Sequence, residues 1–205
     1  MKHLIFGLFC AAITFSFPPY AAADPSVPPS KSMIDDALIS EVRGWAQSNV
    51  VFLTLEDRNK KNKDLDAAKI DALDKQWRAE RKESDQPLIT AVLSSPLSGY
   101  LTRIQANSLG LYTEIFVIDA KGLNAGQSAI TSDYMQGDEA KWLKTFKVGH
   151  DAVFIDDPEF NKETGTWRAQ LNMTLAKGNE AIGSLTVEIN LTELERRRNA
   201  TLAQN

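Results

Sequence analysis

The sequence predicts an α+β domain in which a helical half precedes an antiparallel sheet. Three observations indicate this. Up to about residue 110, apolar residues recur at the helical spacing of three or four positions. From residue 112 onward they alternate or form short runs, as in strands. The late strands are separated by short turns, which favour antiparallel pairing.

The first expected helix is long for a domain of this size. Ser32 is its candidate N-cap, and the helix runs to about Asp57. Its stretch 50–55 (Val-Val-Phe-Leu-Thr-Leu) is more apolar than one buried face requires. We therefore expect this helix to cover the apolar face of the sheet and to be a candidate dimer surface.

Two further helices complete the helical half. Asp64 or Asp66 caps the second, which passes through Trp77. Residues 78–87 are nearly all polar and are expected to form a solvated connection. The third helix begins at Ser95-Pro96 and ends near Gly110, with proline in its first turn and glycine after its last.

The second half is expected to be a five-stranded meander with one inserted helix. The strands span residues 112–119, 123–129, 153–155, 167–175 and 182–189, and the inserted helix spans 138–146. In the fourth strand Trp167, Ala169, Leu171, Met173 and Leu175 share one face, whereas Arg168, Gln170, Asn172 and Thr174 share the other. A short arginine-rich helix begins at Thr192.

The chain ahead of the helices is read as a leader. Residues 1–23 have a short basic start, a 14-residue apolar run and small residues before Asp24, the pattern of a cleaved signal peptide. An uncleaved anchor remains the alternative. Residues 24–30 form a proline-rich leader, residues 31–110 the helical part of one domain, and residues 111–205 its sheet part. The mature chain is therefore expected in the periplasm or outside the cell.

Composition excludes several classes of function. The formal net charge is -4, which is unlike a general nucleic-acid binder. After removal of the leader, His150 is the only histidine and no cysteine remains, so we expect no nucleophilic triad and no catalytic residue. Acidic groups near 133–139 and 156–159 do not match an EF-hand loop, so no metal and no cofactor is expected.

Four blocks in the second half resemble a known family. They span residues 114–124, 131–142, 154–160 and 181–190, and the second contains Ser-Asp-Tyr-Met-Gln-Gly-Asp-Glu at 132–139. In order and spacing they resemble the Cache sensor domains, the extracytoplasmic PAS-like (PDC-type) modules of bacterial receptors. The resemblance implies a long N-terminal helix and further helices packed on a five-stranded antiparallel PAS-like sheet.

The resemblance also implies where a ligand lies: between the sheet and the segments 131–150 and 156–165 that cross its outer face. The expected ligand-binding residues are Asp133, Tyr134, Trp142, Arg168, Gln170 and Asn172. Arg168 suits a carboxylate, Asp133 suits an ammonium group, and Tyr134 or Trp142 adds a cation–π contact. The alternatives left open are ordinary packing of the aromatic residues, a solvated strand face and a helix cap at Asp133.

The function expected from this resemblance is sensing. The module binds a small polar metabolite of the amino acid or organic acid class and signals through a non-covalent membrane receptor or kinase. We expect no nucleic-acid partner and treat the N-terminal helix as the surface for a homodimer. The alternative is an interaction or structural protein on a retained sensor scaffold that binds no small ligand.

Overall fold

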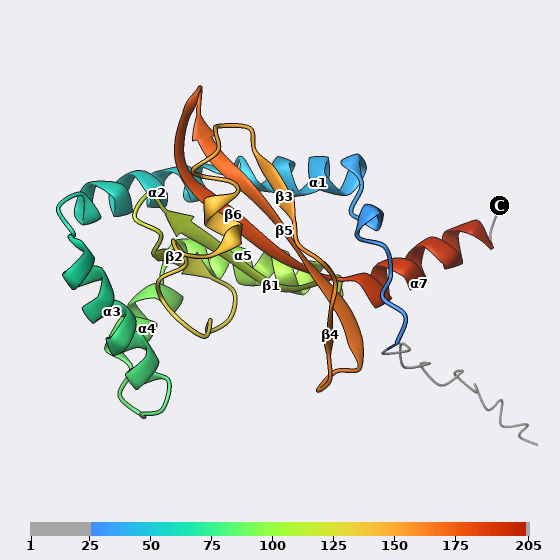
Figure 1. The fold of residues 1–205 in the computed structure, drawn as a ribbon, viewed down its shortest axis with the longest axis horizontal. Helices are drawn as coiled ribbons and strands as arrows, with labels where there is room; N and C mark the ends of the chain where they lie inside the picture. Colours follow the sequence, from blue (N-terminus) through green and yellow to red (C-terminus); the bar gives the residue numbers. More distant parts are fainter. Residues whose placement is uncertain (1–25, 204–205) are drawn as a thin grey trace, which may run out of the picture.

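The computed structural model describes residues 26–203, and the predicted signal peptide at 1–23 lies outside them (Figure 1). Within this range the helices are η1 (Lys31–Met33), α1 (Asp36–Ala46), α2 (Asn49–Asn62), α3 (Ala67–Glu80), α4 (Pro87–Leu93), α5 (Pro96–Asn107), α6 (Ala140–Leu143) and α7 (Leu191–Leu202). The strands are β1 (Tyr112–Asp119), β2 (Asn124–Gln127), β3 (Val153–Ile155), β4 (Glu159–Asn161), β5 (Thr166–Lys177) and β6 (Glu180–Asn190). The α+β prediction is confirmed.

The prediction of one long first helix is wrong, because the segment from Ser32 to Asp57 forms two helices, α1 and α2. Asp35, and not Ser32, caps α1: its side chain accepts a hydrogen bond from the backbone N–H of Leu38 at 3.0 Å. Ser48 then has an extended backbone, which ends the first helix and begins α2. The break allows the apolar faces of both helices to reach the same core.

The solvated connection predicted at 78–87 is shorter than expected. The helix α3 continues to Glu80, which is buried. Its carboxylate accepts hydrogen bonds from the backbone N–H groups of Leu88 and Ile89 at 2.8 and 2.9 Å. Glu80 therefore satisfies the first N–H groups of α4 from outside that helix. Together α3 and α4 form a hairpin that extends from one end of the molecule (Figure 1).

The sheet has six antiparallel strands in five positions. Its order is β2-β1-β6-β5-β3, and β4 also pairs with β5. The edge beside β5 is thus formed by two short strands, and Asp156, Asp157 and Pro158 separate them. Proline has no N–H for the ladder, which explains an interruption at this edge.

The two faces of the sheet are both covered. On the inner face the alternating apolar residues of β5 pack in the main core with α1, α2 and α5, as the alternation predicted. On the outer face Asn172 and Thr186 are fully buried, and the covering segment 128–152 packs its helix α6 against β5 and β6. Thr186 Oγ1 donates to Asn172 Oδ1 at 2.8 Å, so this pair is satisfied within the protein.

The described residues contain no candidate for a membrane-spanning helix, because no helix among residues 26–203 combines the necessary length with apolar composition.

Candidate functional site

A polar pocket of about 230 Å³ lies on the outer face of the sheet, and we call it the sheet pocket. It is bounded by the start of α6, by the break between β3 and β4, and by β5 and β6. The lining residues are Glu139, Ala140, Lys141, Asp156, Asp157, Glu159, Arg168, Ala169, Gln170 and Glu188. The pocket thus lies between the two crossing segments that the resemblance implied.

The two cations of the sheet pocket are engaged by carboxylates. Arg168 Nη1 lies 2.9 Å from Glu188 Oε2, and both side chains are about one-fifth exposed, at 19% and 20%. Lys141 Nζ lies 2.8 Å from Glu139 Oε2, and the Lys141 side chain is 12% exposed. Partial burial strengthens such pairs relative to pairs on the surface.

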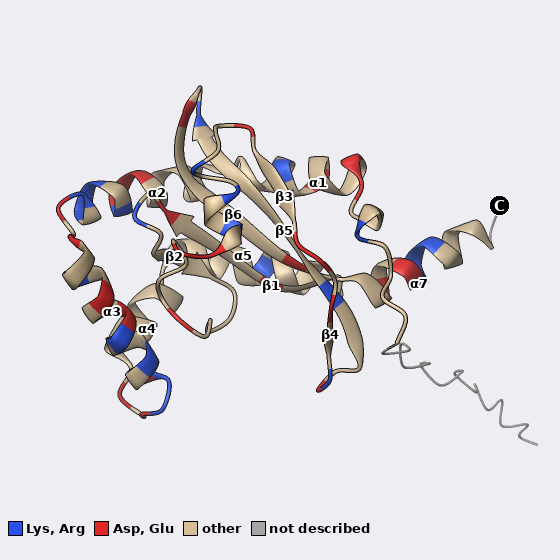
Figure 2. Cartoon of the chain, in the orientation of Figure 1, with Lys and Arg blue, Asp and Glu red and all other residues tan. Residues whose placement is uncertain are grey.

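The remaining carboxylates give the sheet pocket an excess of negative charge. Asp157 pairs with Lys31 at 2.5 Å on the surface. No ion pair to Asp156 or Glu159 is present between residues 26 and 203. The acidic stretch entering β4 is red in Figure 2, beside the blue position on β5. The lining therefore favours a ligand that carries positive charge.

Glu114 lies beside the sheet pocket and was missed by the sequence reasoning. It is paired with Glu188 across β1 and β6, on the outer face. Burial is the largest cause that raises the pKa of Glu114, to about 7, and the negative charge of Glu188 adds to it, whereas Lys141 and Arg168 act in the opposite direction. A glutamate in a strand that is apolar on both faces was the signal available in the sequence.

Only two of the six expected ligand-binding residues line the sheet pocket, namely Arg168 and Gln170. Trp142 is 6% exposed, stacks on Phe146 with ring centroids 4.9 Å apart, and donates Nε1–H to the carbonyl oxygen of Asp119 at 3.2 Å. Asn172 donates to the Phe154 carbonyl oxygen at 3.2 Å. Trp142 thus holds the covering segment on β1, whereas Asn172 bonds within the sheet to β3.

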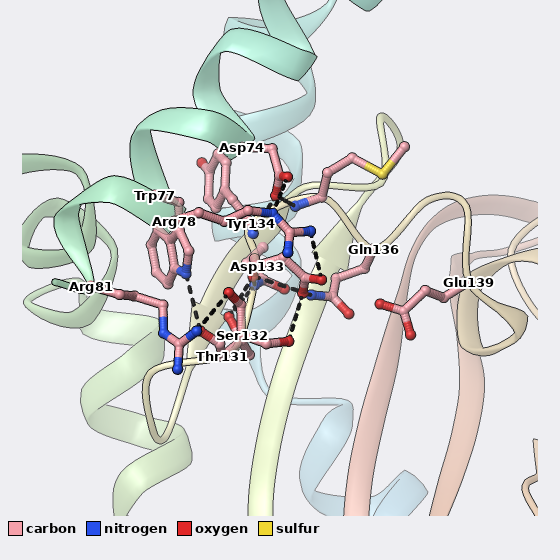
Figure 3. Close-up of polar contacts among 12 residues, drawn as sticks. Asp74, Trp77, Arg78, Arg81, Thr131, Ser132, Asp133, Tyr134, Gln136 and Glu139 are labelled. Carbon is pink, nitrogen blue, oxygen red and sulfur yellow. Dashed lines mark hydrogen bonds and ion pairs between the residues drawn. The ribbon is translucent and has the colours of Figure 1, made fainter.

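Asp133 and Tyr134 belong to a separate cluster in which α3 holds the loop after β2 (Figure 3). The Tyr134 ring is 1% exposed and stacks on Trp77, with centroids 5.2 Å apart and an interplanar angle of 16°. Trp77 Nε1 donates to the Thr131 carbonyl oxygen at 3.1 Å. Arg58 donates to the Tyr134 hydroxyl. Tyr134 is therefore a packing residue of the α3–α4 hairpin.

Carboxylates and arginines complete this cluster. Asp74 Oδ1 accepts the backbone N–H groups of Tyr134 and Met135 at 2.8 and 3.0 Å. Arg78 bridges Asp74 and Asp133, at 2.7 and 3.0 Å (Figure 3). Burial raises the pKa of Asp74, but the hydrogen bonds from Arg78 and from the loop outweigh it, so the net direction is downward.

A short chain of hydrogen bonds connects this cluster to the sheet pocket. Gln136 donates Nε2–H to Asp133 Oδ1 at 2.5 Å and accepts from Lys141 Nζ at 3.2 Å. Since Lys141 lines the sheet pocket, its position is coupled to the loop that α3 holds.

No group of three or more histidine, cysteine, aspartate or glutamate side chains is arranged to hold a metal ion in residues 26–203.

No protein-family model and no curated protein sequence matches the chain. Among solved structures it is similar to a domain described as a sensory box/GGDEF family protein of Vibrio parahaemolyticus (10% identity, TM-score 0.46, 78% of this chain and 55% of that one). It is also similar to the ligand-binding domain of the Campylobacter jejuni chemoreceptor Tlp3 in complex with 4-methylisoleucine (10% identity, TM-score 0.38, 75% and 65%). A third similar structure is the ligand-binding domain of the Pseudomonas aeruginosa PAO1 amino acid chemoreceptor PctC in complex with GABA (11% identity, TM-score 0.36, 78% and 62%).

The chain spans less than two thirds of the length of each of these three structures.

Proposed function

We propose that the protein is a sensor domain outside the cytoplasm that binds a small polar metabolite in the sheet pocket. In this proposal it reports ligand binding through a non-covalent membrane receptor or kinase. One observation carries the proposal: a pocket of about 230 Å³ with charged walls lies between the sheet and its covering segments. Ligand pockets of proteins combine such concavity with a few placed polar groups.

The charges of the sheet pocket favour a ligand that has an ammonium group. Five carboxylates line the pocket with two cations, and Asp156 and Glu159 are the carboxylates available for new contacts. Arg168 can exchange Glu188 for a ligand carboxylate, which it would hold through two parallel hydrogen bonds. An amino acid satisfies both requirements, whereas a dicarboxylate would face like charges.

Thermal unfolding of the purified chain with amino acids, amines and organic acids tests the proposal. A ligand at about a hundredfold excess over its Kd adds about 2.7 kcal/mol to the free energy of unfolding. We expect a rise in Tm with an ammonium-bearing class only. Arg168→Gln should reduce that rise, whereas Arg103→Gln, at an exposed arginine of α5, should leave it unchanged. Equal losses in both variants would contradict the assignment of the site.

A second candidate function has an observation in its favour. Tyr134 and Trp142, the expected aromatic wall, are 1% and 6% exposed and packed against Trp77 and Phe146. Residues that fill space in this way suit an interaction protein on a sensor scaffold without a small ligand. No change in Tm across the panel, together with cross-linking of the chain to a membrane protein, would favour this candidate.

A further inference from the structure

A second concave surface lies among the helices that pack on the inner face of the sheet. It is a groove of about 550 Å³ between α2, the junction of α4 and α5, and β2, and we call it the helical groove. The lining residues are Val50, Leu53, Thr54, Asp57, Arg58, Lys61, Ala91, Val92, Ser95, Pro96 and Ala125. It shares no residue with the sheet pocket.

Arg58 lines the helical groove as a half-buried cation without a counter-ion. Its Nη2 group donates to two neutral acceptors, the Tyr134 hydroxyl and the Asn124 carbonyl oxygen. Its Nε–H is buried and has no hydrogen-bond partner. No carboxylate pairs with Arg58 within residues 26–203. A partly buried guanidinium is stabilised by an anion, and Arg58 lines the helical groove, from which an anion can approach it.

The neighbouring charges are already neutralised. Asp57 and Lys61 form an ion pair at 2.7 Å, one helical turn apart on α2. The helical groove thus offers one uncompensated positive charge, which suits a ligand with one negative charge. A planar carboxylate can accept two hydrogen bonds from a guanidinium, which a single lysine cannot supply.

The rest of the helical groove is largely apolar. Leu53, in the first half of α2, is 65% exposed, so a large aliphatic side chain stands in contact with water there. Val50 precedes it by almost one turn, and Val92 and Pro96 form the facing wall. These side chains can cover a hydrocarbon tail of several carbons, which would lose contact with water on binding.

We propose that the helical groove binds a small amphipathic monocarboxylate, with its carboxylate on Arg58 and its hydrocarbon tail along Leu53. The class includes medium-chain fatty acids and short aryl-alkyl acids. The proposal is independent of the ligand of the sheet pocket, because no lining residue is shared.

Titration calorimetry of the purified chain with octanoate tests the proposal. Octylamine, which has the same tail and the opposite charge, and acetate, which lacks the tail, are the matched probes. We expect binding of octanoate and no comparable binding of the other two. Equal binding of octylamine would overturn the proposal, since an apolar surface alone would then account for it.

Two variants locate the site. Leu53→Glu places a like charge beside the carboxylate and should weaken octanoate binding about tenfold or more. Val148→Glu, at another exposed apolar residue (69%), is the matched control and should bind as the wild type. Arg58→Gln should weaken octanoate binding at least as much, with folding checked by circular dichroism because Arg58 also holds Tyr134.

Two further experiments distinguish binding in the helical groove from binding in the sheet pocket and from dimerisation of the chain. Arg168→Gln should leave octanoate binding unchanged, and a loss there would overturn the assignment to the helical groove. Sedimentation of Leu53→Glu tests whether a second copy of the chain occupies the groove. A wild-type dimer that Leu53→Glu dissociates, without octanoate binding, would also overturn the proposal.

Discussion

Glu114 and Glu188 face each other across β1 and β6, on the outer side of the sheet. Their environments differ, because Glu188 is paired with Arg168 and accepts from the Thr113 hydroxyl. The Glu114 carboxylate has no hydrogen bond or ion pair among residues 26–203. Two neighbouring carboxylates with one counter-ion are most stable when one of them carries a proton.

This relationship predicts a pH-dependent stability that Glu114→Gln abolishes. The pKa of Glu114 is about 7 in the folded chain against 4.5 for an unperturbed glutamate. Between pH 4.5 and about pH 7, Glu114 is protonated more in the folded state than in the unfolded state. The free energy of unfolding therefore falls as pH rises through this range. Glu114→Gln should be more stable than the wild type by about 1–3 kcal/mol at pH 8.

Urea unfolding at pH 4.5 and at pH 8 measures this difference. The gain from Glu114→Gln should shrink toward zero at pH 4.5, where the wild-type carboxyl is largely protonated in the folded chain. A gain of the same size at both pH values would show that amide packing, and not ionisation, is responsible.

At Glu193 we expect the opposite dependence, in which the free energy of unfolding falls as pH is lowered. Hydrogen bonding from the Arg196 side chain lowers its pKa to about 2, against the effect of burial and with help from Arg197. The ion pairs of Glu193 with Arg196 and Arg197 are both 2.7 Å long. This stabilisation is complete above pH 4.5 and is lost as pH falls toward 2.

We expect Glu193→Gln to lower the free energy of unfolding by about 1–2 kcal/mol at pH 7. Chemical denaturation down to pH 2.5 should show the wild type and the variant converging. Glu195→Gln, at an exposed position two residues later in α7, is the control and should change little at any pH.

Two glycine substitutions should change stability in opposite directions. A Cβ on Gly183 would overlap the carbonyl oxygen of Ile118 and the methyl groups of Leu55, where β6 passes beneath α2. A Cβ on Gly44 in α1 meets nothing within 4 Å. Gly183→Ala should destabilise by about 1–3 kcal/mol, whereas Gly44→Ala should stabilise by about 0.5–1 kcal/mol.

Thermal unfolding of the two glycine variants and the wild type tests both predictions: Tm should fall in Gly183→Ala and rise in Gly44→Ala. A neutral Gly183→Ala would mean that α2 can move away from β6 at little cost.

Trp77 should determine whether the loop 131–136 stays in place. Trp77→Ala removes a fully buried ring and its stacking on Tyr134, at a cost of about 3–5 kcal/mol. Hydrogen exchange should quicken in 131–136 and in α3 while β5 and β6 remain protected. Trp77→Phe keeps a ring but loses the bond to Thr131, so it should have a smaller effect in the same residues. Uniform loss of protection would mean that the hairpin and the sheet unfold together.

Much of the fold could be predicted from the sequence because its signals are local. The alternation in 167–175 and 182–189 places Leu171 and Val187 on the inner face, where the structure has them. The break of the first helix was missed because the residues at the break, Gln47 and Ser48, are neither proline nor glycine. The start of the helix differs from the prediction only in its cap, which is Asp35 and not Ser32.

The site could be predicted only in part, because its contacts join distant segments. Arg168 and Gln170 lie on a strand whose outer face was predictable, and both line the sheet pocket. Tyr134 instead stacks on Trp77, 57 positions earlier, in a hairpin whose position no spacing in the sequence specifies. A polar strand face also does not reveal whether solvent or another segment covers it, as Asn172 illustrates.

The hairpin of β5 and β6 contributes to both covered faces of the sheet, and this restricts how the chain can align during folding. A slip by one residue would turn Leu171 toward the covering segment 128–152 and Asn172 toward the helices. The main core would then receive an amide, and the outer face would lose the bond between Asn172 and Thr186. Misaligned hairpins are thus penalised on both sides at once, so the two strands have a single productive pairing.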